Sequence, residues 1–493
     1  AAVAEILATH LGGRAKDYLE LIQRNAASRY EVVAKHVPAA TYTALQADMS
    51  LGIDGDGERP WYGVFSEPDP IRTYPNRSLA SSVVGFLNSE GDGAMGLEAA
   101  FDEQLSGVPG TMTYDRSTFG RIPLGTNIVE PAVDGVNYTL TIDSDLQWVA
   151  EQALAEGVRN AGAATGTLVV MNVDTGEILA LANNPTFDAS HPGAADVSDL
   201  SNRAVTQIYE PGSVQKVLTM AALADSGLVT PDTPVVVPPR IASGDGYVRD
   251  SFDHGTLQLT ARGVMAQSSN IGTIELARQL PKDDFADYLS DFGLGQATQL
   301  GLPAESSGSI PAADMADYTR DQVSFGQGLS VTAVQMSAAL SAAVNGGTWH
   351  QPYIVESATA ADGTEVALPE RGSREVVSPE ASAATVNMME AVITQTGDDR
   401  GIPGYRTIGK SGTAQRFDQS CKCYSGYTAS FAGAAPAEDP QILVYVVLDQ
   451  PTNGNLGSQL ALPVVNDVLQ VALPRYNVLP STSPPLVEPL TFE

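Results

Sequence analysis

The strongest constraint on the fold of this chain is the position of its strand-forming segments, which fall in two groups far apart in the sequence. The first group begins at residues 138–142 and continues in residues 167–173 and 177–182, which flank a short turn as the arms of a β-hairpin do. The second group falls at residues 428–448, and the Ala-rich stretch between the groups, residues 213–345, has predominantly helical spacing. We therefore predict an α+β domain whose sheet joins early and late strands.

Local signals predict where several helices of the second half begin and end. Thr332 and Gln335 fit a capping box, and Gly346 follows the same helical pattern as a stop signal. Residues 460–473 have the spacing of a closing helix. The Pro-rich tail that starts at Pro480 predicts an extended or disordered segment.

The charge and composition exclude several classes of protein. The chain has 58 acidic and 27 basic residues, and its formal net charge of −31 would be repelled by nucleic acid and by anionic membrane surfaces. It contains no apolar run of about 18 residues, the length that spans a bilayer. It begins with neither Met nor a signal sequence, so we expect it to be part of a longer protein whose anchor lies outside. Its two cysteines and five histidines lack zinc-site spacing, so no metal site is expected.

Ser213 and Lys216 form the first candidate catalytic pair. Pro211 and Gly212 interrupt the chain before them and the apolar residues that follow have helical spacing, so both side chains are predicted on one face of a helix start. A serine becomes a nucleophile when a nearby base takes its proton, and a lysine is such a base only where its amine is neutral. Ser-x-x-Lys also arises by chance, with the serine as an ordinary helix cap.

Two further segments carry less weight when each is considered alone. Ser268 and Asn270 lie between two predicted helices, in a turn where both residue types are common. Lys410 is followed by Ser, Gly412 and Thr413 at the start of a predicted strand. A lysine beside two hydroxyls and a glycine predicts a site that binds a carboxylate, although an ordinary edge strand has the same composition.

The order of these three segments along the chain is more specific than any one of them. Ser-x-x-Lys, then Ser-x-Asn, then Lys-Ser-Gly resembles the layout of the penicillin-recognising active-site serine enzymes. The third segment departs from the commoner Lys-Thr-Gly, but Ser411 keeps the hydroxyl. Arg72-Thr-Tyr-Pro75 and Gly96-Leu-Glu98 resemble the N-terminal signatures of class B penicillin-binding proteins, and Cys421-Lys-Cys-Tyr424 resembles the division-specific FtsI-type enzymes of actinobacteria.

This resemblance implies a domain organisation. We expect an N-terminal mixed α/β pedestal of the penicillin-binding protein dimerisation type at residues 1–135. An α+β transpeptidase domain, with a mainly antiparallel sheet flanked by helices, is expected at residues 136–476, followed by a Pro-rich tail at 477–493. The pedestal contains no reactive cluster, so it is expected to dock membrane partners, among them a septal glycosyltransferase and other division proteins.

The resemblance also assigns roles to the residues of the three segments. Ser213 would attack the carbonyl between the two terminal D-alanines of a peptidoglycan stem peptide, and Lys216 would take the hydroxyl proton. Ser268 would relay a proton to the leaving amine, and Asn270 would bind the donor peptide and help to hold Lys216. The substrate-binding residues would be Lys410, Ser411, Gly412 and Thr413. Backbone N–H groups of Ser213 and Thr413 would form the oxyanion hole.

The activity implied in this way is D,D-transpeptidation during septal cell-wall synthesis, with an acyl-enzyme intermediate, no metal and no cofactor. β-Lactams would acylate the same serine. The enzyme would be a single-pass protein of the cell membrane with its catalytic domain outside. The alternatives are an elongation-type class B transpeptidase, a D,D-carboxypeptidase that uses water as acceptor, and a β-lactam sensor that does not turn over.

Cys421 and Cys423 are expected to form a disulfide. The implied location outside the membrane permits disulfides, and the two residues are separated only by Lys422. The alternative is a pair of free thiols in a surface loop. Because the ring is so short, it would remove little chain entropy, and its expected effect is to stiffen the loop beside the active site.

Overall fold

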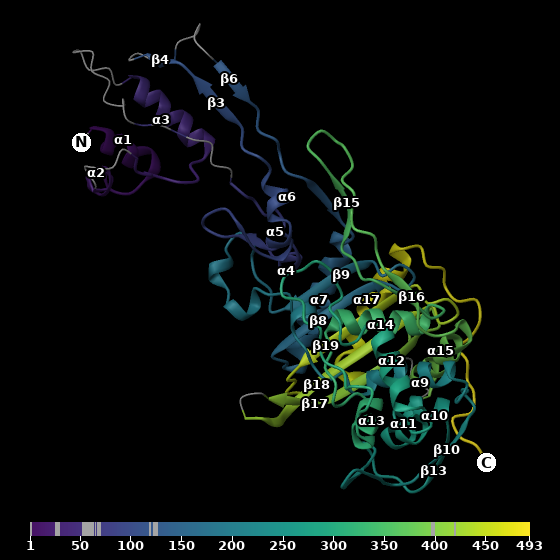
Figure 1. The fold of residues 1–493 in the computed structure, drawn as a ribbon. Coiled ribbons are helices and arrows are strands. Elements are labelled where there is room, and N and C mark those ends of the chain that lie inside the picture. Colours follow the sequence, from purple (N-terminus) through teal and green to yellow (C-terminus); the bar gives the residue numbers. More distant parts are fainter. Residues whose placement is uncertain are drawn as a thin grey trace. The chain divides into compact units, whose positions relative to one another are not determined.

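The computed structural model describes residues 2–24, 30–51, 64, 66, 71–117, 120–121, 127–395, 400–418 and 421–493. The chain divides into two compact units, Ala1–Pro75 and Asn76–Glu493. Figure 1 shows the fold of each unit. No helix among the described residues is long and apolar enough to cross a membrane.

The described residues of the first unit form the helices α1 (Ala2–Leu11), α2 (Ala15–Gln23) and α3 (Ala39–Leu51). Ala4, Leu7 and Leu45 are buried among them. His10 Nε2 lies 2.7 Å from Asp48 Oδ2, which links α1 to α3.

The second unit begins with short elements that precede the catalytic domain. The helices are α4 (Ser81–Val84), α5 (Gly96–Ala100) and α6 (Asp102–Ser106). The strands are β1 (Phe86–Leu87), β2 (Gly93–Met95), β3 (Thr111–Tyr114), β4 (Arg116–Ser117), β5 (Gly120–Arg121) and β6 (Asn127–Glu130). This segment is bonded to the domain that follows, because Ala80 N donates to Glu151 Oε1 at 2.8 Å and Asn183 Nδ2 donates to Ser82 Oγ at 3.0 Å. The division between compact units therefore falls after Pro75, whereas the limit at residue 135 remains a sequence prediction.

A five-stranded antiparallel sheet forms the centre of the second unit. Its strands, in spatial order, are β17 (Ile408–Asp418), β18 (Cys423–Ala435), β19 (Ile442–Asp449), β8 (Thr165–Asn172) and β9 (Ile178–Asn184). The late strand β19 pairs with the early strand β8, with Val446 opposite Leu168, which confirms the predicted α+β sheet. The predicted strand at 138–142 is present as β7 (Asn137–Leu140), but it pairs with β15 (Val355–Thr359) outside this sheet.

The two faces of the sheet are covered by different helices (Figure 1). Since successive residues of a strand point to opposite faces, Leu168 and Val170 join a core with α7 (Ser144–Ala161) and α17 (Leu462–Arg475). Val169 and Met171 join the core on the other face. The helices of that second core include α9 (Lys216–Asp225), α14 (Ala333–Val344) and α15 (Pro379–Thr394). The capping box predicted at Thr332 and Gln335 is present at the start of α14, which confirms that helix signal.

The middle of the chain departs in part from the helical prediction. Its remaining helices are α10 (Ala261–Gln267), α11 (Asn270–Ala277), α12 (Lys282–Asp291) and α13 (Asp317–Ser324), and the short helix α8 (Arg203–Thr206) precedes this stretch. It also contains four short strands that the sequence interpretation missed, β10 (Pro234–Val237), β11 (Ile241–Ser243), β12 (Gly246–Val248) and β13 (Leu257–Thr260). Strands of three or four residues carry too little alternation to be separated from helical surroundings.

The remaining short elements connect these parts of the unit. They are the 3-10 helices η1 (Pro192–Ala194), η2 (Val197–Asp199) and η3 (Gly212–Gln215), the strands β14 (Thr348–His350) and β16 (Ser373–Glu375), and the helix α16 (Gly457–Leu460).

The C-terminal tail is extended and bonded to the domain. Thr491 forms a β-bridge with Leu259, and Leu486 N donates to Glu390 Oε1 at 3.1 Å. Arg262 on α10 forms an ion pair with Glu488. The tail was predicted to be extended or disordered, and in the structure it is extended.

Candidate active site

Ser213 lies in a tight turn at the start of a buried helix. The 3-10 helix η3 carries it, and α9 continues from Lys216, so both residues sit on one continuous element. Gly212 has φ +56° and its N–H donates to Gly326 O at 3.0 Å. A Cβ on Gly326 would lie 1.9 Å from Gly212 O, so only glycine permits this close approach. Ser213 Oγ forms no hydrogen bond among the described residues, and Lys216 Nζ is bonded to Ser268 and Asn270 rather than to Ser213.

Lys216 is fully buried and its amine is directed at the second segment. Its Nζ donates to Ser268 O at 2.6 Å and to Asn270 Oδ1 at 2.8 Å. Ser268 Oγ is a third acceptor at 3.3 Å. Every one of these acceptors belongs to Ser268 or Asn270, so the structure brings the first two predicted segments together.

Ser268 and Asn270 are placed by the junction of two helices. Ser268 ends α10 in the left-handed conformation, with φ +56°, which is uncommon for a residue other than glycine. Ser269 caps α11 by accepting a hydrogen bond from Gly272 N at 2.9 Å. Asn270 then begins α11, and its Nδ2 donates to Arg249 O at 3.2 Å, which leaves Oδ1 for Lys216.

Lys410 reaches the same serine from the edge strand β17. It is fully buried, and its Nζ donates to Ser268 Oγ at 2.9 Å and to Ser411 O at 3.0 Å. Ser268 Oγ therefore has both amines within hydrogen-bond distance, at 3.3 Å and 2.9 Å. A single hydroxyl thus connects the three segments that the sequence analysis selected.

The two buried amines differ in their affinity for protons. Burial, followed by the nearby charge of Lys410, lowers the pKa of Lys216 well below its usual value, while Asp250 acts in the opposite direction. Burial lowers the pKa of Lys410 to about 7. A charge on Lys410 opposes protonation of Lys216. The pair can present a neutral base beside a cation.

The glycine of the third segment lets β17 lie directly against the nucleophile turn. A Cβ on Gly412 would lie 2.9 Å from Pro211 O and 2.3 Å from Ser430 Oγ. On the other side, a Cβ on Gly212 would lie 3.2 Å from the carbonyl carbon of Thr413. The backbone of Thr413, predicted with that of Ser213 to form an oxyanion hole, therefore lies beside Gly212, the residue before Ser213.

The side chains of Ser411 and Thr413 lie on the same face of β17 because they are two residues apart. Thr413 Oγ1 donates to Asn455 O at 3.2 Å and accepts a weak contact from Gly457 N at 3.4 Å. A proton given to Asn455 O is not available to a carboxylate. Thr413 would therefore bind a substrate carboxylate through this hydroxyl only after its side chain turns.

The hairpin formed by β17 and β18 extends beyond the catalytic residues. Cys421 and Cys423 are joined by a disulfide with their Cα atoms 5.2 Å apart. Tyr424, the next residue, donates from its hydroxyl to Glu210 Oε1 at 3.4 Å. The disulfide-closed end of the hairpin thus touches the segment that carries Ser213.

Glu210 and Asp250 are site residues that the sequence interpretation missed. Glu210 precedes the nucleophile turn, its Oε1 accepts from Gly328 N at 2.9 Å, and burial raises its pKa. Asp250 lies behind Ser269. The position of Glu210 beside the Ser-x-x-Lys segment was a usable signal. Nothing in the sequence marks Asp250 among the other acidic residues.

No group of three or more His, Cys, Asp or Glu side chains suited to a metal ion occurs in the part of the chain that the structure describes.

Comparison with known families agrees with this geometry. The family described as penicillin binding protein transpeptidase domain matches residues 166–470, and the penicillin-binding protein dimerisation domain matches residues 1–140. The chain belongs to the penicillin-binding protein transpeptidase family. The family membership and the transpeptidase fold predicted from the sequence are both confirmed.

Relatives of this transpeptidase include a named penicillin-binding protein and a named peptidoglycan D,D-transpeptidase. The chain is 37% identical over 441 residues to penicillin-binding protein PbpB of Mycolicibacterium smegmatis, covering 86% of this chain and 68% of the relative. It is 31% identical over 424 residues to peptidoglycan D,D-transpeptidase FtsI of Escherichia coli K12, and the match covers 85% of this chain and 69% of the relative. It thus spans about two thirds of the length of these curated relatives.

Solved structures of similar proteins have the same fold. Penicillin binding protein 3 of Mycobacterium tuberculosis matches with a TM-score of 0.77 and 34% identity, covering 85% of this chain and 94% of that one. The same protein has also been solved in complex with aztreonam, a β-lactam. A peptidoglycan synthetase of Bifidobacterium adolescentis matches with a TM-score of 0.81 and 29% identity, and the match covers 100% of this chain and 87% of that chain.

Proposed function

We propose that this chain is a peptidoglycan D,D-transpeptidase that cross-links stem peptides through an acyl-enzyme on Ser213. The observation that carries the proposal is the position of Ser268 Oγ, with Lys216 Nζ at 3.3 Å and Lys410 Nζ at 2.9 Å. A proton taken from the nucleophile by Lys216 can pass through this hydroxyl toward a leaving amine. The names of the relatives PbpB and FtsI agree with this activity.

Acylation follows from the arrangement of these side chains. Ser213 Oγ attacks the carbonyl between the terminal D-alanines while its proton moves to Lys216. The new C–O bond forms, the C–N bond breaks, and the proton reaches the departing D-alanine amine through Ser268. Backbone N–H groups of Ser213 and Thr413 stabilise the negative oxygen, a contribution of about 3–4 kcal/mol for one such donor.

Lys410 and Lys216 have different tasks in this mechanism. Lys410, whose pKa is about 7, gains charge when a substrate carboxylate binds beside it, because a nearby anion favours the ammonium form. That charge in turn keeps Lys216 neutral. In the second half of the reaction an amine of another stem peptide attacks the ester on Ser213, and the amine proton returns to the serine oxygen.

We further propose that the enzyme acts in septal synthesis, in a cell membrane with the catalytic domain outside. The relatives named FtsI and PbpB support the division role. The N-terminal segment, matched by the dimerisation domain over residues 1–140, would dock a septal glycosyltransferase and other division proteins. This role is tested in cells by replacing residues 1–135 with the equivalent part of an elongation enzyme. Loss of septation with retained penicillin labelling supports it, and full division contradicts it.

The catalytic proposal is tested by turnover of a depsipeptide that ends like D-Ala-D-Ala, with and without an added amine acceptor. We expect an aminolysis product in the presence of the amine. Hydrolysis alone would indicate a carboxypeptidase, and acylation without turnover would indicate a sensor. Ser213→Ala should abolish turnover, whereas Ser226→Ala, at the far end of α9, should not.

A further inference from the structure

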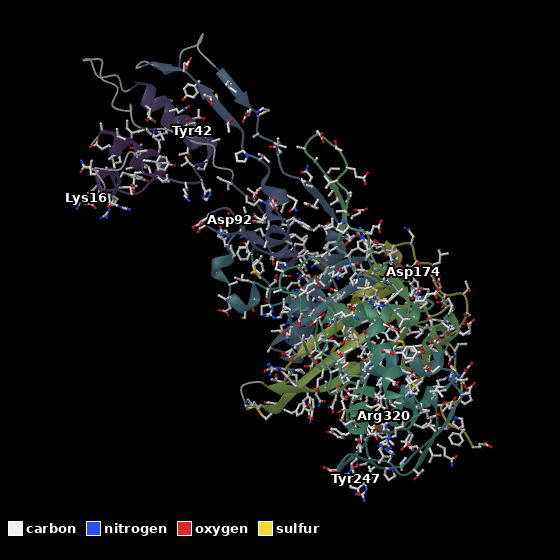
Figure 2. The ribbon with its side chains drawn as sticks, viewed as in Figure 1. Lys16, Tyr42, Asp92, Asp174, Tyr247 and Arg320 are labelled. Atoms are coloured by element: carbon white, nitrogen blue, oxygen red, sulfur yellow. A yellow bond between two sulfur atoms is a disulfide. The ribbon has the colours of Figure 1, made fainter. Side chains whose placement is uncertain are left out.

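The segment between β12 and β13 runs directly behind the Ser268–Asn270 turn. It follows Tyr247, which projects into solvent from β12 (Figure 2). Two residues later, Arg249 O accepts a hydrogen bond from Asn270 Nδ2. This contact fixes the orientation of the Asn270 amide, so that its oxygen faces Lys216 at 2.8 Å.

Asp250 is the next residue, and its side chain is completely buried. Its Oδ2 accepts a hydrogen bond from Ser269 Oγ at 2.6 Å, and its Oδ1 accepts one from Ile271 N at 3.0 Å. The carboxylate thus holds the residue between Ser268 and Asn270 together with the first turn of α11. A carboxylate at a helix start is also favoured by the partial positive charge there.

His254 lies on the other side of the same carboxylate. Its Nε2 lies 3.2 Å from Asp250 Oδ2 but forms no hydrogen bond among the described residues, and its side chain is 5% exposed. Its Nδ1 lies 2.5 Å from Gly255 O. The ring therefore lies against the carboxylate without a hydrogen bond to it. The ring also packs against Phe252, with centroids 5.0 Å apart.

We propose that Asp250, packed against His254, is a positioning residue that holds Ser268 and Asn270 against Lys216. Its two oxygens accept hydrogen bonds from the Ser269 hydroxyl and from the first turn of α11. Ser268 and Asn270, the residues on either side of Ser269, are the ones that contact Lys216. The titratable groups around this cluster are Lys216 from α9, Lys410 from β17 and His254 from the segment itself. The inference rests on the proposed function, because it assumes that Lys216 is the base for acylation.

The role predicts different effects on the pH profile of acylation when Asp250 or His254 is replaced. Asp250 favours the charged form of Lys216, so Asp250→Asn should lower the pKa of Lys216 and move the acid limb of the profile to lower pH. His254→Phe keeps a ring beside Phe252 and leaves the bonds of Asp250 to Ser269 and Ile271 in place. The acid limb of this variant should stay at the wild-type position.

Asp250→Asn should also slow acylation at its optimum by about tenfold or more, because misplacing groups in an active site is costly. An amide has one acceptor oxygen, so it cannot accept from both Ser269 Oγ and Ile271 N as the carboxylate does. A residue with only a structural role would change the melting temperature or the active fraction, but not the position of the acid limb.

The test is the rate of acylation by a fluorescent penicillin from pH 5 to 10, normalised to the active fraction. Asp225→Asn is the matched control, because Asp225 also accepts from one hydroxyl, Tyr288 Oη at 2.7 Å, and one backbone N–H, Ser378 at 2.6 Å. Asp225 lies at the opposite end of α9 from Lys216, so the pH profile of acylation in Asp225→Asn should match that of the wild type.

The possible results separate this inference from the proposed function. An acid limb displaced to lower pH in Asp250→Asn, together with a lower rate at the optimum, supports the positioning role. An Asp250→Asn protein with the wild-type rate, or with an acid limb that does not move, overturns it. If Asp250→Asn does not fold, Ser269→Ala decides alone, because it removes one of the two bonds of Asp250 but keeps its charge, and a wild-type acylation rate in Ser269→Ala overturns the role. If Ser213→Ala is labelled as fast as the wild type, the proposed function fails first.

Discussion

Replacing Asn270 by Asp tests whether Lys216 acts as a neutral base. Asn270 Oδ1 accepts a hydrogen bond from Lys216 Nζ at 2.8 Å, and Asp has nearly the same shape. The substitution therefore places a negative charge beside the buried amine with little change in packing. Because an adjacent anion stabilises an ammonium ion, Lys216 should hold its proton and lose its capacity to accept one from Ser213.

The size of the effect follows from the distance. At 2.8 Å, with an effective dielectric constant of about 20, one added negative charge favours the ammonium form by about 6 kcal/mol. Even a third of that energy, about 2 kcal/mol, changes a protonation equilibrium by more than tenfold. We therefore expect Asn270→Asp to reduce acylation at pH 7.5 by at least about tenfold, with partial recovery as the pH rises.

The assay is the rate of labelling by a fluorescent penicillin across pH, with the melting temperature measured in parallel. Asn387→Asp is a matched control, because Asn387 Oδ1 also accepts from a cation, Arg262 Nε at 2.8 Å, and arginine stays protonated in either case. It should acylate like the wild type. The reasoning is refuted if Asn270→Asp acylates at the wild-type rate at pH 7.5, or if its loss of rate is the same at every pH.

Three further results are expected. Lys216→Arg should abolish acylation because a guanidinium stays protonated, whereas Lys410→Arg should retain measurable acylation because the guanidinium can bind a carboxylate; equal rates would contradict these separate roles. Binding of a substrate carboxylate, measured as KM, should weaken as the pH rises through about 7 and Lys410 loses its charge, and a KM that does not change over this range would count against the anchor. Reduction of the Cys421–Cys423 disulfide should change the acylation rate more than the melting temperature, because the ring is short, and two free thiols in the unreduced, denatured protein would end this prediction.

The sequence could predict the groups of the active site because their order along the chain is itself specific. Ser213, Lys216 and Lys410 are reactive residue types set in turn and strand signals, and the structure places both of the amines beside Ser268 Oγ. The sheet was predictable for a similar reason. Strands such as β8 and β19 are long apolar runs with turns at their ends, and few other arrangements bury them.

The parts that could not be predicted depend on contacts between distant segments. The carboxylate of Asp250 is one of many in an acidic chain, and only the fold brings it against Ser269. The pKa of Lys410 is lowered by burial, which no local pattern reveals. The path of the tail is set by contacts such as the bridge between Thr491 and Leu259, which tertiary packing decides.

The most direct test of the whole account is to locate the acyl group after penicillin treatment. Trypsin would cut after Arg203, and the acylated peptide Ala204–Lys216 contains Ser213 as its only serine. We expect intact mass to rise by one penicillin per chain and the modification to map to this peptide, with none in Ser213→Ala. A modification on the peptide Gly263–Arg278, which contains Ser268, or on no peptide at all, would contradict the assignment of the nucleophile.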